Sequence, residues 1–138
     1  MMADSLPGHV NALFVYGTLM PASGHAMAKR LQGQSVYLGP GWIPGRLYSF
    51  GRYPGAVRSR APGEGIHGDA VRLRNPSASL AWIDVYEGCG QRQPEPHAYE
   101  RVIVPVTLNS GELLNAWVYF YKLPIGCARY LPDGRFLP

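Results

Sequence analysis

The sequence is poor in the residues that hold metals and form disulfides. Its 138 residues include only two cysteines, Cys89 and Cys127, and four histidines. No Cys-x-x-Cys pair is present, and the histidines show no spacing typical of metal ligands. We therefore expect free thiols, no metal site and no cofactor. No Cys/His or Ser/His arrangement points to a covalent catalytic mechanism either.

Charge and long apolar runs are also scarce. Charged residues make up 16% of the chain, and no run approaches the roughly 18 apolar residues that a membrane span needs. The N-terminal stretch MMADSLPGHVN has neither the charged nor the apolar region of a secretory signal. These absences predict a cytoplasmic protein with no membrane partner. The net charge is +4, but the basic residues are scattered, which favours a solvated basic surface over a nucleic-acid partner.

What the sequence does contain is typical of a small, turn-rich globular protein. Hydrophobic residues make up 46% of the chain, and there are 17 glycines and 13 prolines. Frequent turns in a short apolar chain favour a β-rich fold. The length predicts one domain over residues 1–138, with an ordered core at about 11–136.

The hydrophobic pattern predicts about seven strands and two helices, which is an α+β fold. Gly-Pro-Gly and Pro-Gly breaks in the second strand segment favour a strongly curved sheet or a barrel. Asn109-Ser110-Gly111 is typical of a hairpin turn, and Pro105 places its strand at an edge or a bulge. Strand segments are expected at 11–16, 35–51 (broken by the Gly-Pro-Gly and Pro-Gly turns), 53–60, 65–75, 99–109 and 112–123, and helices at 22–33 and 75–88.

Capping residues set the expected ends of the two helices. The first is expected to begin after Ser23 as its N-cap and to end at Gly33 in the left-handed conformation. In the second, Asn75 is the expected N-cap, Pro76 suits the first turn and Gly88 ends the helix.

An acidic residue lies on the apolar side of the second helix. On a helical wheel, Glu87 falls four residues after Ile83 and seven after Leu80, inside the arc that faces the core. Burial and the negative end of the helix dipole both disfavour a carboxylate there, so both raise its pKa. A carboxyl group of this kind suits general acid/base catalysis. The alternative is a solvated acid at the end of the helix.

The stretch VYGTLM ends the first apolar strand without a charged residue. Gly17 is expected to let the backbone adopt unusual angles and approach a ligand closely. Successive N–H groups in such a turn form a nest for a carboxylate or an oxyanion. An ordinary turn at the end of a strand is the alternative.

Four short motifs occur in a characteristic order: FVYGTLM, YPGAV at 53–57, HGDAVRL at 67–73 and IDVYEG at 83–88. Together with the hairpin YERVIVPVTLNSGELLNAWVYFY and the tail PDGRF, they resemble the γ-glutamylcyclotransferase-like family. This family includes γ-glutamylamine cyclotransferases and the avirulence-induced proteins. The resemblance covers residues 12 to about 136. It implies a small mixed β-barrel with flanking helices and a pocket at one end.

The resemblance also implies a reaction and a set of site residues. Tyr16, Gly17, Thr18 and Leu19 would bind a γ-glutamyl group through their backbone amides, and Glu87 would be the general acid/base. The α-amine of the substrate would attack its own γ-carbonyl, so that 5-oxoproline forms and an amine leaves. The implied partner is a small γ-glutamyl compound, and the implied enzyme is independent of metals.

Three tyrosines and two arginines are further candidates. Tyr53 is expected to line the pocket, although packing in the core explains it equally well. Of Tyr119 and Tyr121, on one strand face, one is a candidate for the pocket, but packing in the core or the hairpin is the favoured explanation for both. Arg46 and Arg101 are candidates for a substrate carboxylate, but nothing in their spacing requires that role.

Two questions stay open on the sequence alone. A non-catalytic module that binds small molecules on the same scaffold is the alternative to an enzyme. The residues do not specify the leaving amine, the oligomeric state or a redox role for the two cysteines.

Overall fold

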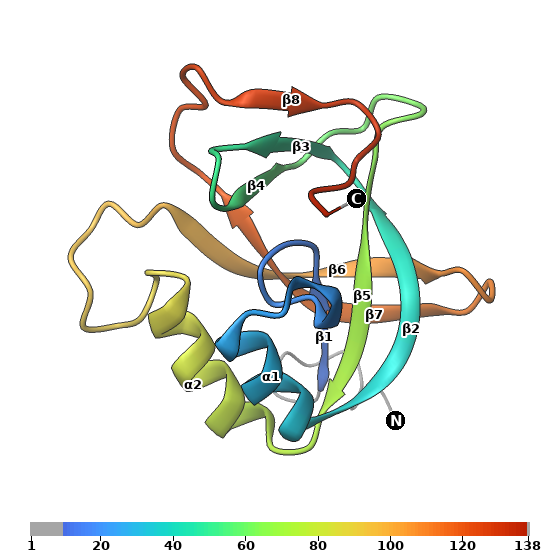
Figure 1. The fold of residues 1–138 in the computed structure, drawn as a ribbon, viewed down its shortest axis with the longest axis vertical. Coiled ribbons are helices and arrows are strands. Elements are labelled where there is room, and N and C mark those ends of the chain that lie inside the picture. The colour runs from blue at the N-terminus through green and yellow to red at the C-terminus, as the bar shows by residue number, and fades with distance from the viewer. Residues whose placement is uncertain (1–9, 138) are drawn as a thin grey trace.

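The structure, a computed structural model, describes residues 10–137, so most of the N-terminal stretch lies outside the described residues. The described residues form eight strands and two α-helices (Figure 1). In chain order they are β1 (Ala12–Val15), a 3-10 turn (Pro21–Ser23), α1 (Ala26–Gly33), β2 (Ser35–Pro44), β3 (Arg46–Ser49), β4 (Pro54–Val57), β5 (Gly65–Leu73), α2 (Pro76–Tyr86), β6 (Tyr99–Leu108), β7 (Leu113–Tyr121) and β8 (Arg129–Leu131).

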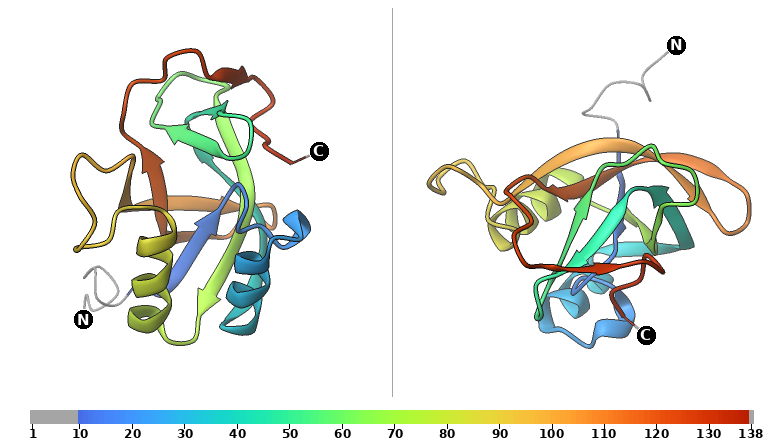
Figure 2. Two further views of the ribbon diagram at one scale, coloured as in Figure 1. Left: turned by 60° about the vertical axis from the view of Figure 1, so that its left-hand side comes forward. Right: turned by 90° about the horizontal axis from the view of Figure 1, so that it is seen from above.

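Five strands close into a barrel in the order β1-β5-β2-β6-β7. β1 runs parallel to β7, and the other barrel pairs are antiparallel, so the barrel is mixed as expected. The remaining strands form a second sheet in the order β4-β3-β8. The two helices lie at one end of the molecule and this second sheet lies at the other (Figures 1 and 2).

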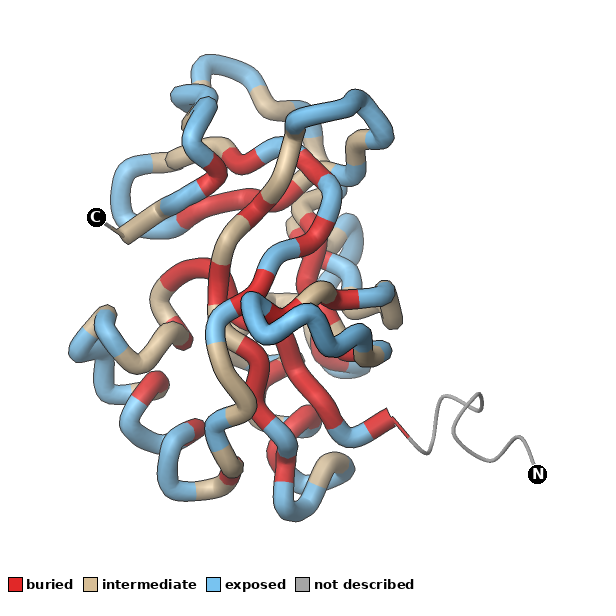
Figure 3. Tube along the Cα trace, turned by 90° about the vertical axis from the view of Figure 1, so that its right-hand side faces the viewer, coloured by how far each residue is buried: buried red, intermediate tan, exposed pale blue. Residues whose placement is uncertain are grey.

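β1 is buried on both of its faces. Phe14 belongs to an apolar cluster that draws side chains from all five barrel strands and from the second sheet. Leu13 and Val15 point the other way and join Leu31 of α1 and Ile83 of α2 in a second cluster. Most buried positions lie in the strands and on the inner sides of the helices. Most loop positions are exposed, although the turn after β1 is largely buried (Figure 3). Since strand side chains alternate, β1 therefore packs between the two apolar clusters.

The ends of α2 agree with the sequence, whereas α1 agrees only in ending at Gly33. The Asn75 side chain caps α2, whereas α1 begins later than expected because Gly24 adopts a left-handed conformation with φ of 71°. The N-cap of α1 is His25, whose Nδ1 accepts a hydrogen bond from the Met27 amide at 3.1 Å. The Ser23 cap was therefore wrong. α1 does end at Gly33 as expected, but Gly33 is not left-handed, and the C-cap is Gln34.

Pro105 lies where β6 has a partner on one side only. It is opposite Asn115 of β7, whereas β2 contacts β6 only at Leu108 and Thr107. Proline has no N–H to donate, but β2 does not pair with β6 at Pro105, so no hydrogen bond to β2 is lost. This fits the expected edge position. Among the described residues, neither helix has the length and apolar character that crossing a membrane requires.

Candidate active site

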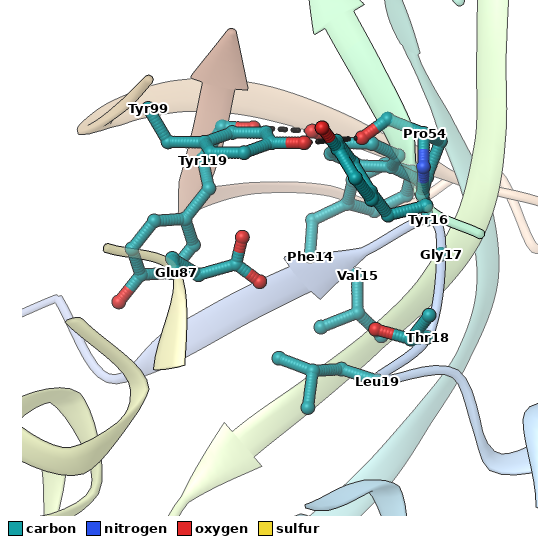
Figure 4. Close-up of a pocket in the computed structure, with 11 residues that line it drawn as sticks. Phe14, Val15, Tyr16, Gly17, Thr18, Leu19, Pro54, Glu87, Tyr99 and Tyr119 are labelled. Carbon is teal, nitrogen blue, oxygen red and sulfur yellow. Dashed lines mark hydrogen bonds between the residues drawn. The ribbon is translucent and has the colours of Figure 1, made fainter. Parts of the chain in front are cut away.

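A narrow cavity of about 40 Å³ lies where the end of β1, the start of β4 and the end of α2 meet. The end of β1 and the turn after it form one wall, and Glu87 extends from the end of α2 toward that wall (Figure 4). The residues that line it are Phe14, Val15, Tyr16, Gly17, Thr18, Leu19, Tyr53, Pro54, Glu87, Tyr99 and Tyr119.

The turn after β1 presents free backbone donors. The Met20 amide donates to the Gly17 carbonyl at 3.0 Å, which closes the turn. Within residues 10–137, the amides of Gly17, Thr18 and Leu19 donate no hydrogen bond to another residue. Buried N–H groups are nearly always paired, with water or a ligand where no protein acceptor is present. This turn can therefore donate hydrogen bonds to a bound group, as a nest does.

Gly17 is required for a different reason from the one expected. Its φ is not positive, so the expectation of unusual backbone angles was wrong. A Cβ at this position would lie 2.5 Å from Cγ and 2.7 Å from Cδ of Pro54. The absent side chain therefore lets β4 approach the turn and close one side of the cavity.

This contact predicts that Gly17→Ala lowers the free energy of unfolding by about 1–3 kcal/mol, because the proline ring is rigid and must move. Gly33→Ala is the matched control. Gly33 lies in α1, and no other segment comes within 4 Å of the position that its Cβ would take, so alanine should be neutral or stabilising by up to about 1 kcal/mol. Urea denaturation of both variants measures the difference. Equal effects of the two substitutions would refute the close-contact explanation.

Glu87 is held by the way α2 ends. It is the C-cap residue, with φ of −82°, and Gly88 follows in the left-handed conformation with φ of 78°. The Gly88 amide donates to the Val85 carbonyl at 3.1 Å, and the Cys89 amide donates to the Asp84 carbonyl at 2.9 Å. These two bonds form a Schellman motif, which fixes the backbone of Glu87. The side chain is thereby directed into the cavity (Figure 4).

The surroundings of Glu87 favour its neutral form. Among the described residues, no group donates a hydrogen bond to its carboxylate. Burial, with the nearby charge of Asp84 as the second cause, raises the pKa of Glu87 from 4.5 to about 7. At neutral pH this carboxyl group can therefore both accept and return a proton.

Tyrosine hydroxyls fasten the walls of the cavity to one another. The Tyr16 hydroxyl donates to the Tyr119 carbonyl at 2.6 Å and accepts from the Ala56 amide at 3.3 Å. The Tyr99 hydroxyl donates to the Pro54 carbonyl at 2.6 Å, and both tyrosine-to-carbonyl bonds are drawn in Figure 4. These bonds join the barrel to the second sheet beside Glu87.

A further bond joins the turn to the helix that carries Glu87. The hydroxyl groups of Thr18 and Tyr86 lie 2.7 Å apart and share a hydrogen bond. Tyr86 is the last residue of α2, directly before Glu87. The turn with free amides and the carboxyl group are thus held at a fixed separation.

The structure brings most of the expected site residues together. Glu87 and all four residues from Tyr16 to Leu19 line the cavity, as do Tyr53 and Tyr119. Tyr121 does not line it, because its ring packs against Phe50 at 4.6 Å and against Tyr99 at 5.4 Å between ring centres.

The two candidate arginines are already paired. Arg46 binds Glu64 at 2.6 Å, and Arg101 binds Asp84 at 2.8 Å. Neither of them lines the cavity, so neither is placed to meet a ligand there.

Four lining residues were missed: Phe14, Val15, Pro54 and Tyr99. The two β1 residues were expected in a buried strand, so their position next to the turn was the available signal. Pro54 and Tyr99 reach the cavity only through tertiary pairing, which leaves no local mark in the sequence.

No metal site is evident in the part of the chain that the structure describes. No three His, Cys, Asp or Glu side chains there are arranged to hold a metal ion. The arrangement at the cavity is instead one carboxyl group with a raised pKa, on the same cavity as a turn whose amides at residues 17–19 have no acceptor among the described residues. Such a pair can move a proton at one atom and stabilise negative charge at another.

Comparison with known proteins gives a consistent result. The family model described as gamma-glutamyl cyclotransferase, AIG2-like, matches residues 13–137. The gamma-glutamylcyclotransferase family protein YtfP of Escherichia coli K12 is 32% identical over 127 residues, which cover 91% of this chain and 95% of that protein. The family protein ytfP of Citrobacter rodentium is also 32% identical, with 91% and 94% covered.

Solved structures share the fold. The solution structure of E. coli ytfP has a TM-score of 0.61 and 28% identity, covering 91% of this chain and 96% of that one. An AIG2-like protein from mouse has a TM-score of 0.63 and 22% identity, covering 93% and 84%. The family model that matches residues 13–137 and the 32% identical YtfP relative show that the chain belongs to the gamma-glutamylcyclotransferase, AIG2-like family.

Proposed function

We propose that this protein releases 5-oxoproline from a γ-glutamyl amine or γ-glutamyl amino acid, with Glu87 as general acid/base. The observation that carries the proposal is the placement of Glu87, whose pKa burial raises to about 7, in a cavity walled by the free amides of residues 17–19. Membership of the family supports a cyclotransferase reaction. The reaction needs no protein nucleophile, and its independence of metals and cofactors is part of the proposal.

The proposed reaction is intramolecular. The α-nitrogen of the substrate attacks the γ-carbonyl carbon, and the Glu87 carboxylate takes a proton from that nitrogen. The amides of Gly17, Thr18 and Leu19 donate to the oxyanion that forms on the γ-oxygen. Protonated Glu87 then delivers the proton to the departing nitrogen as the bond to the γ-carbon breaks. A five-membered lactam and a free amine result.

The shape of the site restricts how a substrate can bind. A cavity of about 40 Å³ has room for only the reacting end of a γ-glutamyl compound. Tyr53 lines the cavity and is 46% exposed, so it marks the open side. We therefore place the leaving amine at Tyr53, where it extends toward solvent, and the chain contacts it less than it contacts the γ-glutamyl group.

A panel of γ-glutamyl compounds with different leaving amines tests the proposal. Wild-type protein should release 5-oxoproline from at least one of them, measured by chromatography of the product. The matched control carries an acetyl group on the α-nitrogen of the same compound and should give no product, because the blocked nitrogen cannot attack. If the protein binds compounds of the panel but releases no 5-oxoproline from any of them, a non-catalytic binding module becomes the better explanation.

A further inference from the structure

Asp84 is held from two sides by charged and polar partners. Arg101 of β6 donates from Nε to Oδ1 at 2.8 Å and from a terminal nitrogen to Oδ2 at 3.1 Å. The Tyr119 hydroxyl of β7 donates to Oδ1 at 2.5 Å. Three short bonds of this kind leave the carboxylate little freedom to rotate, and bidentate pairing with arginine is both strong and directional.

The same residue is bound into the structure that directs Glu87. Asp84 precedes Glu87 by three positions, and side chains at this spacing are neighbours about 5–6 Å apart on a helix surface. Its carbonyl accepts the Cys89 amide in the Schellman motif that ends α2. Movement of Asp84 would therefore disturb both the end of the helix and the charge beside Glu87.

Arg101 is itself restrained. Its guanidinium lies 4.2 Å from the centre of the Trp117 ring, on the strand that pairs with β6. The Arg101 and Asp84 side chains are only 24% and 21% exposed, so the pair is partly shielded from water. Shielding makes a charge act over a longer distance on its neighbours than it does at the surface.

We propose that Asp84 and Arg101 form a positioning pair for Glu87: Arg101 and Tyr119 fix the Asp84 carboxylate three residues before Glu87 at the end of α2, and the opposite charges of the pair act on Glu87 in opposite directions. Tyr119 links the pair to the cavity, since its ring lines the cavity while its hydroxyl points away from Glu87 (Figure 4). The inference rests on the proposed function in so far as Glu87 transfers protons. Neither Asp84 nor Arg101 lines the cavity, so neither is assigned contact with a substrate.

Burial disfavours ionisation of several other groups around Glu87. Burial raises the pKa of Tyr16, Tyr99 and Tyr119, and it raises the pKa of Cys89 to about 11. Tyr53 and Tyr86 add phenol groups at the edge of the site. Among the described residues near Glu87, Asp84 and Arg101 form an ion pair of opposite charges, and His25 packs on the ring of Tyr86, so the two substitutions should act on Glu87 in opposite directions.

The test is a titration of Glu87 by carbon-13 NMR, with labelled glutamate side chains and Glu87→Gln to identify its signal. Asp84→Asn keeps the shape and an acceptor for Tyr119, and it should move the Glu87 midpoint to lower pH by about one pH unit. Arg101→Gln leaves Asp84 unbalanced and should move the midpoint to higher pH by a similar amount. Arg101→Lys retains the charge and should stay near wild type.

Opposite shifts in the first two variants, with the lysine variant near wild type, support the pair. Shifts in the same direction, or none in any variant that folds, overturn it, because a merely structural role would not reverse sign with the charge removed. If Asp84→Asn does not fold, the comparison of Arg101→Gln with Arg101→Lys decides. The titration needs no turnover, so it stands or falls separately from 5-oxoproline release.

Discussion

Replacing Glu87 with glutamine should lower the rate of 5-oxoproline release by about 10²–10⁴-fold, the usual contribution of a positioned general acid/base. Glutamine keeps the size of the side chain but cannot accept the proton of the attacking nitrogen. The Schellman motif that fixes position 87 is made by backbone atoms, so the substitution leaves it intact. Steady-state kinetics with the best compound of the panel measures the loss.

Affinity should change little in the same variant. The proposed holding contacts are the backbone amides of residues 17–19, which Glu87→Gln does not alter. Calorimetric titration with the acetylated, unreactive compound measures this directly. Glu112→Gln, an exposed position next to the β6–β7 hairpin turn, is the matched control and should retain both rate and affinity. If Glu87→Gln releases 5-oxoproline as fast as wild type, Glu87 is not the general acid/base.

The same substitution should stabilise the protein more at pH 8 than at pH 5. The gain in the free energy of unfolding over wild type should be larger at pH 8 by about 2–3 kcal/mol. Burial raises the pKa of Glu87 to about 7 in the folded chain, against 4.5 for an ordinary glutamate. Between these values the folded state binds more protons than the unfolded state, so wild-type stability falls as the pH rises. Glutamine carries no such cost, and the advantage of the variant therefore grows with pH.

Urea denaturation of wild type and Glu87→Gln at several pH values from 5 to 8 measures this growing difference. Glu112→Gln should run parallel to wild type across the same range, because its side chain stays in water in both states. A difference between Glu87→Gln and wild type that is constant from pH 5 to pH 8 would show that Glu87 is ionised throughout and not buried unfavourably.

The position of Glu87 on the apolar side of its helix could be predicted from the sequence, because the signals for that position are local. Its distance from Leu80 and Ile83 puts it on the apolar side of a helix, and Gly88 marks the end of that helix. The structure confirms the helix and its glycine end, and it places the carboxyl group in the cavity. The predicted rise in its pKa is found and burial is its first cause, but the second cause is the charge of Asp84 and not the helix dipole that the sequence argument invoked.

Gly17 shows what local reasoning cannot supply. The sequence marked it as special, but for backbone angles that it does not adopt. The true reason is contact with Pro54, which is remote in the chain and meets Gly17 only when the second sheet packs on the barrel. Tyr99 was missed for the same reason, since its hydrogen bond to the Pro54 carbonyl depends on tertiary packing.

Short elements with weak patterns were also beyond the sequence. β8 has three residues, and only its pairing with β3 defines it as a strand. The start of α1 depends on a histidine cap and a left-handed glycine, Gly24, whereas Ser23 carried the stronger statistical preference. Strand and helix segments with clear periodicity were predicted, and the contacts that close the cavity were not.

The pH dependence of kcat/KM for 5-oxoproline release, measured on wild type and Glu87→Gln together, tests the central claim most directly. The account predicts a wild-type rate that rises with pH and is half-maximal near pH 7, where the Glu87 carboxylate forms. The residual rate of Glu87→Gln should lack this rise. A wild-type rate that is flat from pH 6 to pH 8, or the same rise retained in Glu87→Gln, would contradict the account.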